Sequence, residues 1–169
     1  LKRLEERAAA AGVDLGDAVA EDRLVALPGD LSEERLGMDE ALFADLAARL
    51  NLIVHPGAIV NWVMLYGQLR AANVVGTHWL LRLAVGGERL TPVSFVSTIS
   101  TVPSGKDEAE IHGEDALLSS PYALSKWVAE RLVRQAGANG LPVMIHRPSM
   151  ITGHSETGFS NATDFVNRY

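Results

Sequence analysis

The chain has 169 residues, of which 47% are hydrophobic and 21% charged, and its formal net charge at pH 7 is −6. This apolar content is enough for one sizeable buried core, and the mixed, net acidic charge leaves no basic face for nucleic acid or an anionic membrane. The sequence has no cysteine and no run of eighteen apolar residues, so disulfides, thiolate metal sites and membrane spans are excluded. We therefore expect a cytoplasmic protein with no bound metal.

Hydrophobic periodicity predicts helices that alternate with strands. In chain order, the predicted elements are a helix at 1–11, a buried strand at 23–31, a helix at 39–50, a strand at 51–58, a helix at 68–85, a strand at 92–100, a loop at 101–118, a helix at 121–137 and a strand at 141–149. This alternation indicates an α/β fold with a parallel sheet and right-handed crossovers. We expect one compact unit with its ligand side at the carboxyl ends of the strands.

A tyrosine and a lysine lie four residues apart at the head of the helix predicted at 121–137. Ser119 and Ser120 are suited to capping this helix, and Pro121 fits its first position. Tyr122 and Lys126 therefore share one helix face. An ammonium beside a phenol would lower the tyrosine pKa, and such a tyrosine can give a proton to a carbonyl oxygen. The alternative is a solvated lysine beside an interfacial tyrosine.

Three hydroxyl side chains follow the strand that precedes this helix, in the sequence FVSTIS. Ser97, Thr98 and Ser100 would stand at the carboxyl end of that strand, where a hydroxyl could assist the tyrosine. The alternative is that they are ordinary strand residues. Trp62 and Tyr66 are one helical turn apart and are interpreted as core residues.

The remaining motifs give no other chemistry. The sequence has no GxSxG elbow and no GxxxxGK[ST] loop, which disfavours a serine hydrolase or a P-loop enzyme. Five histidines lack metal-type spacing and are interpreted as packing or surface residues: His55, His78, His112, His146 and His154.

Together these features resemble an extended short-chain dehydrogenase/reductase, and more narrowly the thioester reductase domain of nonribosomal peptide synthetases, carboxylic acid reductases and aminoadipate reductases. The matching segments are GDLSEERLGM at 29–38, LIVHPGAIVNWVMLYGQLRAANVVGT at 52–77, FVSTIS at 95–100, YALSKWVAERLV at 122–133 and HRPSMITGHSETG at 146–158. The resemblance covers nearly the whole chain.

The resemblance implies a role for each matching residue. Thr98 would orient the substrate carbonyl and Tyr122 would be the proton donor, while Lys126 would bind the nicotinamide ribose and lower the tyrosine pKa. Asn73 would help to hold the active-site helix. The cofactor-binding residues would be Asp30 and Leu31 at the adenine, Gly57 and Ala58 after the strand, Tyr122 and Lys126, and Pro148 and Ser149 at the nicotinamide.

The sequence departs from this family in two ways. Ser149 stands where many relatives have glycine, next to the nicotinamide. No glycine-rich turn precedes residue 23, although the fold uses one to seat the pyrophosphate. In a sheet of order 3-2-1-4-5-6, the strand at 23–28 would be the third, and the first two strands and the C-terminal substrate lobe have no counterpart. We therefore expect residues 1–169 to be part of an NAD(P)-binding Rossmann-like domain with a doubly wound parallel sheet.

The implied function is NADPH-dependent reductive release of an acyl or peptidyl thioester from a phosphopantetheinyl carrier protein. The product would be an aldehyde, with further reduction to an alcohol left open. One alternative is another extended reductase or epimerase that acts on a sugar nucleotide or a free carbonyl compound. An alternative of another class is a nucleotide-sensing domain without turnover, which would not need Tyr122.

Overall fold

The computed structural model describes residues 1–102 and 120–160, and the chain divides into two units. One unit consists of residues 1–27 together with residues from 150 onward, and the other is Pro28–Ser149. The expectation of one compact unit is therefore wrong. The division falls where the predicted strand at 23–31 would have joined the sheet.

That strand does not form. Residues 23–30 have no regular secondary structure, and Val25 and Leu27 are 69% and 48% exposed. A strand is stable only where neighbouring strands take up its backbone hydrogen bonds. In the expected order this segment is not adjacent to the strand that follows it, and the described residues contain no other strand beside which it could lie.

The unit that contains the N-terminus has little regular structure in its described residues, 1–27 and 150–160. Its helices are α1 (Lys2–Ala10) and α2 (Gly16–Ala20), so the helix predicted at 1–11 is confirmed. Residues 150–160 have neither helix nor strand, and a turn there is closed by backbone hydrogen bonds between His154 and both Gly158 and Phe159.

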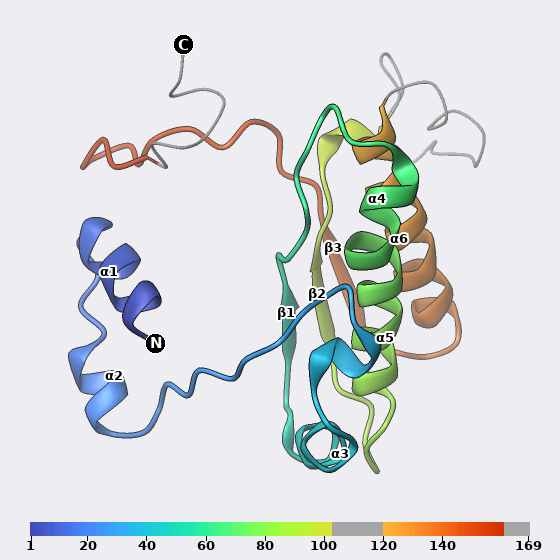
Figure 1. The fold of residues 1–169 in the computed structure, drawn as a ribbon, viewed down its shortest axis with the longest axis horizontal. Coiled ribbons are helices and arrows are strands. Elements are labelled where there is room, and N and C mark those ends of the chain that lie inside the picture. The colour runs from blue at the N-terminus through green and yellow to red at the C-terminus, as the bar shows by residue number, and fades with distance from the viewer. Residues whose placement is uncertain (103–119, 161–169) are drawn as a thin grey trace. The chain divides into compact units, whose positions relative to one another are not determined.

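The second unit contains a parallel sheet of three strands in the order β1-β2-β3 (Figure 1). The strands are β1 (Ile53–His55), β2 (Val93–Val96) and β3 (Val143–His146), with Ile53 opposite Val93 and Val93 opposite Val143. They correspond to the fourth, fifth and sixth strands of the expected order. The prediction of an α/β, Rossmann-like fold is thus confirmed.

Helices cover one face of this sheet, as Figure 1 shows for α4, α5 and α6. In the described residues of this unit, the helical elements are η1 (Glu34–Gly37), α3 (Glu40–Arg49), α4 (Tyr66–Arg70), the π-helical turn η2 (Ala71–Val75), α5 (Gly76–Ala84), η3 (Ile99–Thr101) and α6 (Pro121–Ala138). The core between sheet and helices includes Val93, Phe95, Ala129 and Val133, each at most 1% exposed. On the opposite face, Val54 and Met144 are 60% and 61% exposed.

The predicted helices at 39–50, 68–85 and 121–137 agree with the structure to within a few residues. The second of them runs without interruption from Tyr66 to Ala84 and contains the π turn η2. Ser120 caps α6 by accepting a hydrogen bond from Ala123 N at 3.1 Å, as predicted. Ser119 and the predicted loop beyond residue 102 lie outside the described residues. No helix in the described parts of the chain is both long and apolar enough to cross a bilayer.

Two glycines of the helix from Tyr66 to Ala84 make a matched test of this packing. A Cβ at Gly76 would lie 2.5 Å from the carbonyl oxygen of Leu31, whereas a Cβ at Gly67 would meet nothing within 4 Å. We expect Gly76→Ala to lower the free energy of unfolding by about 1–3 kcal/mol through overpacking. Gly67→Ala should raise it by up to about 1 kcal/mol, because alanine favours helix. Urea unfolding of the complete protein measures both, and equal effects would contradict the packing described.

Candidate active site

Helix α6 buries Lys126 against the carboxyl end of the central strand β2. Lys126 is 2% exposed, and its Nζ donates a hydrogen bond to the carbonyl oxygen of Val96 at 2.7 Å. The same Nζ lies 4.4 Å from the centroid of the Phe95 ring, a favourable cation–π distance. Tyr122, one turn earlier in α6, is 7% exposed. The structure thus excludes the solvated alternative for the lysine.

Thr98 lies two residues beyond the carbonyl that Lys126 contacts. Its Oγ1 accepts a hydrogen bond from Ser100 N at 3.3 Å and so caps η3. Backbone bonds tie this turn to the segment after β3, since Ser97 N donates to His146 O at 2.7 Å and Ile99 N to Pro148 O at 3.0 Å. The predicted Thr98, Lys126 and Pro148 therefore belong to adjoining segments at the carboxyl ends of β2 and β3.

Burial has the largest effect on the pKa values of Tyr122 and Lys126. It lowers the pKa of Lys126 to about 8, although the charge of Glu130 acts in the raising direction. Burial also raises the pKa of Tyr122 above its ordinary value. The sequence predicted that Lys126 would lower the tyrosine pKa, and this effect is not found.

A loop that leaves β1 is fastened to the same helix by Asn73. This asparagine, 1% exposed, lies within the π turn η2. Its Oδ1 accepts from Ile59 N at 2.7 Å, and its Nδ2 donates to Ile59 O at 3.0 Å and to Ser125 Oγ at 2.9 Å. Ser125 Oγ donates in turn to the Tyr122 carbonyl oxygen at 2.7 Å. Asn73 therefore joins the loop to the helix of the candidate site.

Trp62, which belongs to this loop, was predicted to be a core residue, and that prediction is wrong. Trp62 is 57% exposed, and its ring centroid lies 5.4 Å from that of Tyr122. Trp62 precedes the helix that begins at Tyr66, so Trp62 and Tyr66 do not share a helix face. The helical spacing gave a wrong prediction for Trp62 because the segment before Tyr66 forms a loop and not a helix.

His55 is the last residue of β1. It is 3% exposed, and its Nε2 lies 3.2 Å from Thr77 Oγ1. Burial, together with the nearby charge of Lys126, lowers the pKa of His55 to about 4, so the imidazole is neutral at pH 7. This agrees with the interpretation as a packing residue. Within residues 1–102 and 120–160, no group of three potential metal-ligating side chains is found.

The predicted adenine-side residues lie next to the loop after β1. A Cβ at Gly57 would come within 2.9 Å of Leu31 Cδ1, so the backbone there approaches Leu31 closely. Asp30 is exposed, and its Oδ1 accepts from Ser32 N at 2.8 Å and Ser32 Oγ at 2.6 Å, which lowers its pKa. Ala58 is half-buried.

The residues after β3 differ in burial. Pro148 is half-buried and Ser149 is exposed. The preceding Arg147 forms a buried ion pair with Glu130, which the sequence analysis did not single out. The available signal was the spacing of Glu130, which lies one helical turn after Lys126 and therefore on the same face of α6.

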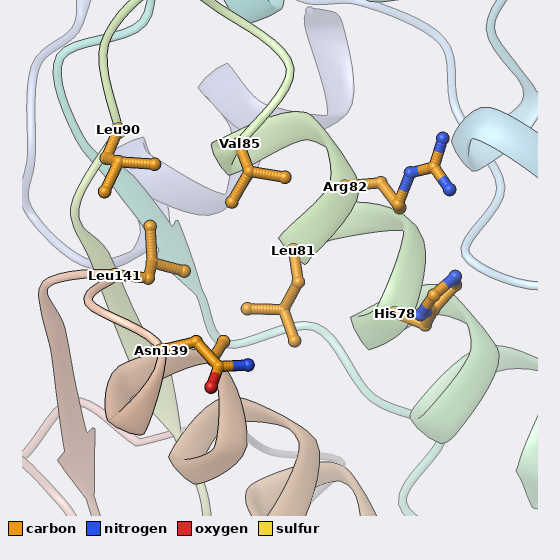
Figure 2. Close-up of a pocket in the computed structure, with 8 residues that line it drawn as sticks. His78, Leu81, Arg82, Val85, Leu90, Asn139 and Leu141 are labelled. Carbon is orange, nitrogen blue, oxygen red and sulfur yellow. The ribbon is translucent and has the colours of Figure 1, made fainter.

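A pocket of about 220 Å³ lies at the opposite end of the sheet. Figure 2 shows Leu81 and Val85 of α5 facing Leu90 and Leu141, which precede β2 and β3. Because Thr98 and the residues after β3 follow the carboxyl ends of those strands, this pocket is not part of the candidate site.

Comparison with known proteins gives consistent matches. The family model described as "Male sterility protein", an NAD-binding family, matches residues 1–169. The isonitrile lipopeptide synthase of Streptomyces coeruleorubidus is 45% identical over 88% of the chain, and the L-2-aminoadipate reductase of Schizosaccharomyces pombe is 36% identical over 99%. The terminal R domain from the myxalamid PKS-NRPS pathway superposes with a TM-score of 0.90 at 40% identity over 99% of the chain. The chain spans 10%, 13% and 43% of these three proteins, respectively.

The buried His55 predicts a loss of stability in mild acid. Its pKa is lowered from 6.5 to about 4, so the unfolded state takes up a proton first as the pH falls below 6.5. The stabilisation from the neutral His55 is present above pH 6.5 and is lost towards pH 4. The free energy of unfolding should therefore fall by about 2 kcal/mol between pH 7 and pH 5. Urea unfolding at both pH values should show a smaller loss for His55→Gln. The exposed His78→Gln should behave as wild type, and equal losses in all three proteins would contradict the assignment.

Proposed function

Because the chain belongs to the family of NAD-binding reductase (R) domains found in nonribosomal peptide and polyketide synthases and in aminoadipate reductases, we propose that it takes part in NADPH-dependent reduction of an acyl thioester. The proposal covers residues 1–169 as part of an NAD(P)-binding domain. A cytoplasmic location stays the prediction made from the lack of cysteine.

The observation that carries the proposal is the buried contact between Lys126 Nζ and Val96 O at 2.7 Å. This contact holds the helix face of Tyr122 and Lys126 against the end of β2, two residues before Thr98. An ammonium has three N–H donors, and in the described residues one of them is used on Val96 O. The other two are available for the hydroxyls of a ribose, which supports the fit of a nicotinamide nucleotide.

We assign the steps to side chains as follows. When bound, NADPH would supply the hydride that adds to the thioester carbon. Thr98 Oγ1 and Tyr122 Oη would donate hydrogen bonds to the carbonyl oxygen, which count most as its negative charge develops. Tyr122 would then give its proton to this oxygen to form a thiohemiacetal. Cleavage of the carbon–sulfur bond would release the aldehyde and the free thiol, with the hydroxyl proton moving to sulfur.

The substrate we propose is an acyl or peptidyl chain on the phosphopantetheine arm of a carrier protein. The similarity to a lipopeptide synthase and to the terminal R domain of a PKS-NRPS pathway supports this proposal. The first product would be an aldehyde, and a second reduction would give the alcohol.

The proton-donor role is tested by Tyr122→Phe in the complete protein. NADPH oxidation is followed by absorbance with an acyl-pantetheine thioester, and the dissociation constant of NADPH is measured in parallel. We expect kcat to fall about 10²–10⁴-fold, the usual contribution of a positioned acid, with NADPH binding retained.

The matched control is Tyr66→Phe, because Tyr66 is half-buried at the start of α4 and lies outside the proposed site. It should keep the wild-type kcat. A wild-type protein that binds NADPH but never consumes it with any thioester would overturn the proposed function.

A further inference from the structure

Glu130 lies at the junction of the segments that make up the candidate site. It occupies the helical turn after Lys126 in α6, and its side chain is 4% exposed. Arg147 Nε donates to Glu130 Oε2 at 3.0 Å, and Arg147 Nη2 donates to Oε1. This is a two-pronged ion pair, the geometry in which arginine binds carboxylates best. The Arg147 side chain is 6% exposed, so the pair is screened from solvent.

The pair links the residues after β3 to the helix. Arg147 directly precedes Pro148 and Ser149, which are proposed to border the nicotinamide. Pro148 O in turn accepts from Ile99 N at 3.0 Å, so the turn that begins at Thr98 belongs to the same assembly. A shift of Glu130 would therefore be transmitted to the proposed cofactor side of the site.

Thr101 adds a contact from the turn itself. Its Oγ1 lies 2.9 Å from Thr98 O and 3.5 Å from Glu130 Oε2. A hydroxyl has one proton, which the shorter distance assigns to Thr98 O. Glu130 consequently packs against the Thr98 turn but is bound to it much less firmly than to Arg147.

The charges around Lys126 come from several elements. Glu130 is on the same helix, and burial would raise its pKa, but hydrogen bonds from Arg147 and from Arg134, whose Nε lies 2.9 Å from Oε1, lower it, so that it is ionised at neutral pH. His55, from β1, is neutral at pH 7, as is Tyr122 on α6. Strand β2 contributes a ring and a carbonyl but no titratable group to the contacts of Lys126. Glu130 is thus the anion that offsets the burial of this ammonium within the described residues.

We propose that Glu130 is a positioning residue of the reductase site, which fastens the Arg147–Ser149 segment to α6 and electrostatically supports the Lys126 ammonium. This inference rests on the proposed function. It gives a role to a buried charge that the reaction itself does not use, since Glu130 is not assigned to substrate or cofactor.

The test is Glu130→Gln in the complete protein, with kcat/KM and the NADPH dissociation constant measured from pH 6 to pH 10. We expect kcat/KM to fall at least about tenfold through misplacement. In wild type, kcat/KM should decline on the alkaline side of its pH profile near the Lys126 pKa of about 8. In Glu130→Gln this alkaline decline should move to lower pH by about one unit, because removing the carboxylate charge lowers the Lys126 pKa further.

The matched control is Arg131→Gln, which also removes one charge from α6. Arg131 is exposed, and its guanidinium carbon lies 5.6 Å from the centroid of the Trp127 ring, so it is not part of the Glu130–Arg147 ion pair. This variant should keep the wild-type kcat/KM and alkaline decline. A folded Glu130→Gln protein with the wild-type alkaline decline and kcat/KM, or an equal loss in both variants, would overturn the proposal.

A second variant covers the case in which Glu130→Gln does not fold, because that change removes the carboxylate from a buried ion pair. The double variant Glu130→Gln with Arg147→Gln removes both charges of the pair and keeps a polar amide at each position. We expect it to fold and to lose at least about tenfold in kcat/KM, and a wild-type value would overturn the positioning role. If wild type proves inactive on thioesters, the proposed function fails, and the pH dependence of NADPH binding in the variants still decides the role of Glu130.

Discussion

The burial of one ammonium group is the constraint on which the rest of the site depends. Lys126 is almost inaccessible to solvent, and a charge in that position is tolerated only where polar partners and counter-charges surround it. Here the partners are a main-chain carbonyl at the end of β2, an aromatic face and the carboxylate of Glu130. Because these groups come from the central strand and from α6, the same contacts that accommodate the charge also set the distance between helix and sheet.

The parallel sheet makes this arrangement possible. All three strands end at one edge, and from that edge emerge the loop with Trp62, the turn with Thr98 and the segment with Pro148. Each is anchored by a different interaction: an asparagine amide for the first, a capped turn for the second and a buried ion pair for the third. The site is therefore built from irregular segments held by regular ones, which is the usual arrangement in α/β folds.

Much of this could be predicted from the sequence, because the relevant signals are local. The capping serine, the proline and the four-residue spacing placed Tyr122 and Lys126 on one face of α6, and alternating periodicities gave the parallel fold. The failures have a common cause, namely that they depend on partners distant in the chain. The run at 23–31 is apolar enough for a buried strand, but no strand of the described residues pairs with it. Trp62 contacts a ring sixty residues away. Glu130 has the spacing of an ordinary surface ion pair, and only the fold shows that Arg147 reaches it.

The π turn at Ala71–Val75 has a consequence for how this chain can change in evolution. A π turn is an α-helix with one residue added, and it lets Asn73 face both the loop after β1 and Ser125 of α6. Deleting one residue from this turn would restore a regular helix, but it would rotate the preceding part by about 100° relative to the part that follows. Leu69, fully buried before the turn, and Leu80, 7% exposed after it, could then no longer both face the core. The helix therefore tolerates substitution on its outer face far better than any change of length.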